Sequence, residues 1–196
     1  MKNSQHYLIT LAQGLAACLL LATLPGCFPL VATGMGAAVL MADDRRTAGA
    51  FVEDEAIENK ALLRVEQKHS AGVHLNVTSF NRLVLLTGEA PSAEVRSDIE
   101  RIVRGIDNVR TVQNEMVVNP TTTLMLRSND SVQTSKVKAR FLDANKFRTN
   151  HVKVVTENGV VYLMGIVKRQ EAEDATEIAR TTSGVQRVVR IFEYMN

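Results

Sequence analysis

Leu83-Val84-Leu85-Leu86-Thr87-Gly88 is the stretch that decides the fold, because a similar stretch, Val160-Val161-Tyr162-Leu163-Met164-Gly165, returns later in the chain. Both runs are apolar and end in a glycine. After a slip of one residue, residues 102–104 match 178–180 and residues 109–112 match 185–188. A period of about 76 residues is too long for a solenoid repeat. The sequence therefore predicts two copies of one small domain.

The segment before each apolar run has the periodicity of a helix. In the first copy the apolar residues recur at every fourth position with one more beside them: Ile57, Ala61, Val65 and Leu62. In the second copy we expect a helix over residues 131–144, with Asp130 as its N-cap.

Strands and a second helix follow in each copy. Residues 73–77 and 152–155 alternate between apolar and polar, and Asn158-Gly159 is a strong signal for a hairpin. An amphipathic helix comes after each glycine, and a last strand is expected near residues 109–118 and 185–194. The order α-β-β-α-β predicts an α+β fold in which a three-stranded mixed sheet packs against two helices in each copy.

The N-terminal region has the layout of an export signal. Met1-Lys2 is a short positive start, and the apolar stretch that follows closes with Leu24-Pro25-Gly26-Cys27. This run resembles the bacterial lipobox, in which the cysteine is acylated and becomes the new N-terminus, although Pro25 stands where Ala, Ser or Thr is usual. The alternative is a transmembrane anchor, because residues 28–42 are also mostly apolar. Pro25 and Gly26 separate two stretches that are each short for a bilayer span.

Composition excludes several classes of function. Removal of residues 1–26 takes only Lys2 from the 23 basic residues, which leaves 22 against 21 acidic ones. Such nearly equal numbers of basic and acidic residues argue against general nucleic-acid binding, which requires a strongly basic surface. Cys27 is the one cysteine left, so no internal disulfide can form. His69, His74 and His151 lack metal-site spacing, and no nucleophile, phosphate-loop or dinucleotide motif is present. We therefore expect a non-enzymatic protein without a metal or other bound cofactor.

The first helices of the two copies differ in charge. Residues 53–68 contain five acids and three bases, whereas residues 131–153 contain six bases and one acid. At 3.6 residues per turn, Val137, Phe141 and Ala144 fall on the side expected to face the sheet. Val132, Lys136, Ala139 and Asp143 fall roughly on the opposite side, with Arg140 on the flank. The predicted phospholipid-binding residues are Val132, Lys136, Lys138, Ala139 and Arg140. The alternative is that these cations only solvate a helix face.

The α-β-β-α-β unit resembles the BON domain. The resemblance rests on the apolar strand that ends in glycine and on the closing turn Gly184-Val185-Gln186-Arg187-Val188. It predicts a signal peptide over 1–26, an apolar tether over 27–50, BON domains over 51–119 and 128–196, and a linker over 120–127.

Two such domains behind a lipobox are similar to dual-BON outer-membrane lipoproteins. The resemblance implies a protein anchored in the outer membrane by diacylglycerol and an N-acyl chain on Cys27, facing the periplasm. It also implies that the second domain binds anionic phospholipids, such as phosphatidylglycerol or cardiolipin, and that the protein helps to maintain envelope integrity. Two alternatives stay open: a periplasmic module that docks an envelope protein, and an unanchored periplasmic stress protein.

Overall fold

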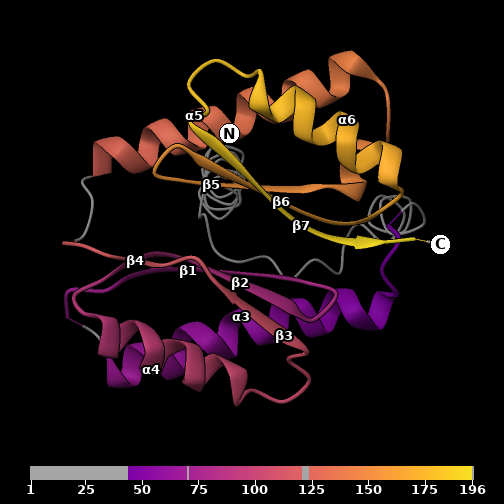
Figure 1. Cartoon of the computed structure of the whole chain (residues 1–196). Coiled ribbons are helices and arrows are strands. Elements are labelled where there is room, and N and C mark those ends of the chain that lie inside the picture. Colours follow the sequence, from indigo (N-terminus) through magenta and orange to yellow (C-terminus); the bar gives the residue numbers. More distant parts are fainter. Residues whose placement is uncertain (1–43, 70, 121–123, 196) are drawn as a thin grey trace, which may run out of the picture. The chain divides into compact units, whose positions relative to one another are not determined.

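The computed structural model describes residues 44–69, 71–120 and 124–195, and every structural statement below concerns these residues. Two units with the same order of elements follow one another (Figure 1). The first contains α3 (Ala48–Lys68), β1 (His74–Phe80), β2 (Leu83–Ala90), α4 (Ala93–Arg104), β3 (Thr111–Asn114) and β4 (Val117–Val118). The second contains α5 (Leu124–Ala144), the 3-10 turn η1 (Thr149–His151), β5 (Lys153–Glu157), β6 (Val160–Val167), α6 (Arg169–Arg180) and β7 (Arg187–Tyr194).

Each unit has a mixed sheet with its longest apolar strand in the centre. β2 pairs antiparallel with β1 and parallel with β3, and β6 pairs in the same way with β5 and β7. The predicted third strand is continuous in the second unit. In the first it is broken into β3 and β4, both paired with β2, by Glu115 and Met116. Met116 is buried in the core, and this inward turn interrupts the ladder.

The helices of each unit cover one face of its sheet. The predicted helix is confirmed as α3, in which Ile57, Ala61 and Val65 are buried with residues of β2 and α4. Leu62, which lies beside them in sequence, is 42% exposed. Val137 and Phe141 of α5 are fully buried in the second unit. Ala144 was expected to join them, but it lies exposed at the last residue of α5, where the helix leaves the sheet.

The opposite faces of the two sheets share a third core. Phe80 and Leu85 of the first unit cluster with Tyr162 and Met164 of the second. Burial raises the pKa of Tyr162 to about 12. Polar pairs surround this core, among them Asn158 Nδ2 to Glu89 Oε1 at 2.8 Å and Lys153 Nζ to Glu58 Oε1 at 3.1 Å. Each central strand is therefore buried on both sides.

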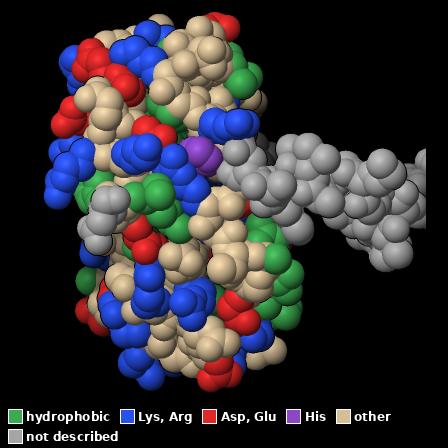
Figure 2. All heavy atoms as spheres, turned by 90° about the vertical axis from the view of Figure 1, so that its right-hand side faces the viewer, with side chains coloured by type: hydrophobic (Ala, Val, Ile, Leu, Met, Phe, Trp, Pro, Cys, Tyr) green, Lys and Arg blue, Asp and Glu red, His purple; other side chains and the backbone are tan. Residues whose placement is uncertain are grey.

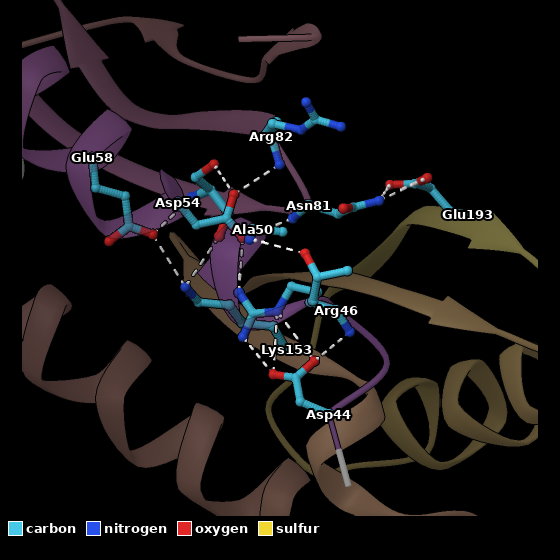
Figure 3. Close-up of polar contacts among 11 residues, drawn as sticks. Asp44, Arg46, Ala50, Asp54, Glu58, Asn81, Arg82, Lys153 and Glu193 are labelled. Atoms are coloured by element: carbon cyan, nitrogen blue, oxygen red, sulfur yellow. Dashed lines mark hydrogen bonds and ion pairs between the residues drawn. The ribbon is translucent and has the colours of Figure 1, made fainter. Parts of the chain in front are cut away.

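A buried aspartate joins the first helix of each unit to the hairpin turn. Asp54 accepts hydrogen bonds from the backbone N–H groups of Asn81 and Arg82, and Figure 3 shows its carboxylate between this turn and Arg46. Asp130 accepts in the same way from Asn158 and Gly159, at 2.8 and 2.9 Å. The prediction that Asp130 is an N-cap is wrong, because α5 begins six residues earlier at Leu124.

The predicted boundaries also shift. Residues 124–127 of the expected linker are helical, since they form the first turn of α5. The end of the expected tether is polar and ordered: Arg45 forms a bidentate pair with Glu171 at 2.6 and 2.8 Å, and Arg46 bonds to Asp44 and Asp54. Hydrogen bonds from Arg45 hold the pKa of Glu171 at about 2. Residues 1–26 and Cys27 lie outside the described residues.

Candidate functional site

The outward face of α5 is the candidate site, because it contains the predicted phospholipid-binding residues. Val132 is 49% exposed, and Lys136 and Ala139 are exposed beside it. Val137 and Phe141 anchor the other side of the helix in the core, which fixes the direction of the outward face. The packing therefore places Val132, Lys136 and Ala139 together on the surface.

A shallow open depression runs along this face. It has a volume of about 500 Å³ and is lined by Ser128, Ser131, Val132, Ser135, Lys136 and Ala139. Three of the five predicted residues line it, while Lys138 and Arg140 do not. Most side chains that line the depression are small serines and an alanine. Val132 and the aliphatic part of Lys136 are therefore its largest apolar surfaces.

The two predicted lysines lie on either side of this face. Positions two apart on a helix point about 200° apart, so Lys136 and Lys138 flank the stripe formed by Val132 and Ala139. Both lysines are exposed, and neither forms an ion pair within the described part of the chain. Their ammonium groups are therefore available to an anionic surface.

Arg140 has a different role in the structure. Its Nη1 donates to the backbone oxygen of Ile178 and to Thr182 Oγ1, both at 2.9 Å, at the end of α6. In the first unit Arg64 Nη1 donates to Gly105 O at 3.2 Å, just after α4. Because both units use an arginine in this way, we assign to Arg140 the joining of the two helices.

Sequence reasoning missed Leu142. It is 67% exposed, and helical geometry puts it near the stripe of Val132 and Ala139, ten residues after Val132. The same 3.6-residue period that placed Val132 outward could have found it. Leu142 extends the apolar stripe to the last turn of α5.

The corresponding face of α3 carries an acid as well as a lysine. At the repeat spacing of 76 residues, Ala56, Lys60 and Leu63 correspond to Val132, Lys136 and Ala139, and Glu66 corresponds to Leu142. Leu63 is 59% exposed, so this face also has an apolar residue. The two helices thus differ mainly in the charges around a shared apolar position.

Other chemistry is absent from the described ranges. They contain no group of three His, Cys, Asp or Glu residues able to hold a metal ion, and none of their helices is long and apolar enough to cross a membrane. Lys and Arg side chains alternate with Asp and Glu over the face drawn in Figure 2.

Comparisons with known proteins agree with the duplication. The profile of the BON domain matches residues 53–120 and 129–195. The chain is 35% identical over 175 residues to the outer membrane lipoprotein DolP of Haemophilus influenzae, covering 88% of this chain and 91% of that protein. It is 30% identical over 154 residues to the 21 kDa hemolysin of Actinobacillus pleuropneumoniae, covering 78% and 79%. It is also 28% identical over 144 residues to the osmotically-inducible protein Y of Escherichia coli K12, covering 71% and 72%.

Proposed function

This chain belongs to the BON-domain family, and from that premise we propose that it is a non-enzymatic outer-membrane lipoprotein whose second BON domain binds anionic phospholipids. The relative that shares 35% of its sequence over most of both chains is an outer membrane lipoprotein. The proposed anchor is Cys27, acylated after removal of residues 1–26. The proposed role is the maintenance of envelope integrity from the periplasmic side.

The observation that carries the lipid proposal is the outward face of α5. Exposed Val132 and Leu142 are apolar groups that can enter a bilayer interface, and Lys136 and Lys138 flank them without ion pairs in the described chain. Each cation near an anionic surface contributes about 1 kcal/mol. Two lysines and two aliphatic residues therefore support weak, reversible binding.

Weak binding is sufficient when the protein is already held at a bilayer. Stable membrane attachment generally requires two signals, and an acyl anchor supplies the first. The anchor on Cys27 would raise the local concentration of α5 at the membrane, so that a modest affinity becomes effective. In this account α5 reads the charge of the lipids and does not by itself retain the protein.

Vesicle sedimentation tests the proposal. A fragment of residues 28–196, which lacks the acylated cysteine, should sediment with vesicles that contain phosphatidylglycerol or cardiolipin and stay in solution with neutral vesicles. Lys136→Glu combined with Lys138→Glu should abolish sedimentation. Circular dichroism should show an unchanged fold, because both side chains are exposed.

A matched control comes from the first copy. Lys60 is exposed on α3 at the position that corresponds to Lys136, and Lys60→Glu should leave sedimentation within error of the parent fragment. Equal losses from Lys60→Glu and from Lys136→Glu alone, which change the net charge by the same amount, would show general electrostatics and contradict a site on α5. No sedimentation of the parent fragment would favour the protein-docking alternative.

A further inference from the structure

A small polar cavity lies between α5 and two turns of the second unit. It has a volume of about 240 Å³, and its walls include Asp130 and Gln133 of α5, the hairpin residues Asn158 and Gly159, and Gly184 before β7. None of the described residues that line it is basic or aliphatic. A water molecule takes up about 30 Å³ in the liquid, so the cavity has room for a small ligand. We call it the Gln133 pocket.

Gln133 is the unusual member of this wall. Its side chain is 5% exposed and its Nε2 donates to the backbone oxygen of Gly184 at 2.9 Å. That bond fixes the orientation of the amide, because the reverse orientation would bring two oxygens together. Gln133 Oε1 is then buried and accepts no hydrogen bond from the described residues. Buried polar atoms nearly always have a hydrogen-bond partner, so we expect a donor that does not belong to the described residues.

The first unit fills the same position with an apolar side chain. Ile57 corresponds to Gln133 at the repeat spacing and is fully buried in the helix-side core. An apolar residue is therefore compatible with this fold, and packing does not require an amide. A Cβ atom on Gly184 would lie 2.3 Å from Gln133 Nε2, so the absence of a side chain at Gly184 is what makes room for the glutamine.

The charge of the wall selects the kind of donor. Asp130 is 6% exposed, and its two oxygens each accept one backbone N–H, from Asn158 and from Gly159. A carboxylate can accept more than two hydrogen bonds, so Asp130 keeps capacity for another donor. Asp130 and Gln133 are three positions apart on α5, which puts them side by side on the helix surface. The wall of the pocket thus holds one carboxylate and one amide oxygen that accepts no hydrogen bond from the described residues.

We propose that the Gln133 pocket binds a primary ammonium group, whose N–H donors bond to Gln133 Oε1 and Asp130. An ammonium group carries a positive charge and three donors, and these match the two acceptors and the charge of the wall. The ammonium can belong to a free small amine or to the head group of an amine-containing phospholipid. This site differs from the outward face of α5 in position and in charge, and it does not rest on the proposed binding of anionic lipid.

Titration followed by NMR tests the proposal on the full chain in a neutral detergent free of amines. Ethanolamine should shift the backbone resonances of Gly159 and Gly184 in a saturable way. Choline is the matched control, because its quaternary ammonium has the charge and no N–H donor, and it should cause no saturable shift. Equal shifts from choline, or none from ethanolamine, would overturn the proposal.

Gln133→Ile copies the first unit and removes the acceptor. It should weaken ethanolamine binding about tenfold or more, as expected for the loss of a hydrogen bond to a charged group. The melting temperature should rise, because a buried unsatisfied acceptor disappears. Gln133→Met, of similar length, serves if the isoleucine does not pack. Unchanged ethanolamine affinity in a folded Gln133 variant would overturn the assignment.

Bicelles separate the two sources of the amine. If the ligand is a lipid head group, bicelles that contain phosphatidylethanolamine should shift Gly159 and Gly184, and pure phosphatidylcholine should not. Shifts with free ethanolamine alone support the pocket and assign it to a soluble amine. Gln133→Ile should leave sedimentation of the soluble fragment with phosphatidylglycerol vesicles unchanged, so the two proposals can fail separately.

Discussion

In the first unit the residue that follows Asp54 by one turn is the buried Ile57, and the outward face of α3 carries acids among its apolar residues. In the second unit the corresponding residues are Asp130 and Gln133, and the outward face of α5 carries lysines without partners in the described chain. The two aspartates have the same structural role, because each accepts hydrogen bonds from two backbone N–H groups of the hairpin turn. Duplication has therefore kept the contacts that build the domain and changed the side chains around the first helix.

The largest expected effects come from a glycine that both units share. A Cβ on Gly88 would lie 2.1 Å from His74 O, and a Cβ on Gly165 would lie 2.3 Å from His151 O. Gly88 also has a φ of +113°, which strains any other residue. We expect Gly88→Ala and Gly165→Ala each to lower the free energy of unfolding by about 3 kcal/mol or more, with the larger loss at Gly88.

Urea unfolding measures this difference. Gly49→Ala, at an open position in the first turn of α3, is the control and should be neutral or slightly stabilising. A mild effect at Gly88 would mean that the strand and His74 separate easily, and the two units would then differ in rigidity.

The aspartates should give the next largest effects. Asp54 is 2% exposed and also accepts from Ser79 Oγ and Arg46 Nη1, at 2.7 and 2.9 Å. Within the described residues, Asp130 accepts only from the backbone N–H groups of Asn158 and Gly159. We expect Asp54→Ala to lower the free energy of unfolding by about 3 kcal/mol and Asp130→Ala by about 2 kcal/mol.

Thermal and urea unfolding of these variants should be compared with Asp143→Ala, which changes an exposed carboxylate on α5. A larger loss for Asp130→Ala than for Asp54→Ala would contradict the view that Asp54 carries the additional contacts.

The smallest expected effect on stability is its dependence on pH through Glu171. Each second helix has one acid in its first turn, Glu94 in α4 and Glu171 in α6, but only Glu171 is paired with Arg45. A carboxyl group with a lowered pKa stabilises the fold above its ordinary pKa of 4.5, and this contribution is lost as the pH falls toward about 2. Arg45→Ala should raise the pKa of Glu171 and cost about 1 kcal/mol at neutral pH.

An NMR titration of the Glu171 carboxyl checks the pKa, and unfolding at pH 6 and pH 3 checks the linkage. The stability difference between Arg45→Ala and the parent should shrink at the lower pH. A constant difference would show that Arg45 acts through packing alone.

The repeat and its order of elements could be predicted from the sequence, because the apolar runs and the Asn158-Gly159 turn are local signals. The packing of one sheet on the other was missed, although an unbroken apolar run such as Leu83 to Leu86 is typical of a strand buried on both faces. Leu85 faces the shared core and its neighbours Val84 and Leu86 face the helices.

The candidate site was only partly accessible from sequence. Helical periodicity placed Val132, Lys136 and Ala139 correctly on the outward side. It could not separate a free cation from Arg140, whose partners lie about 40 residues away at the end of α6. The unsatisfied oxygen of Gln133 had no sequence signal either, because it depends on how Gly184 packs against α5.

One fluorescence measurement tests the lipid proposal most directly. The fragment of residues 28–196 has no cysteine, so Ala139→Cys on α5 and the corresponding Leu63→Cys on α3 can each hold one environment-sensitive dye. With phosphatidylglycerol vesicles, the dye on α5 should shift to shorter wavelength and the dye on α3 should not. Equal shifts at both positions, or a shift only on α3, would contradict the assignment of lipid binding to the second domain.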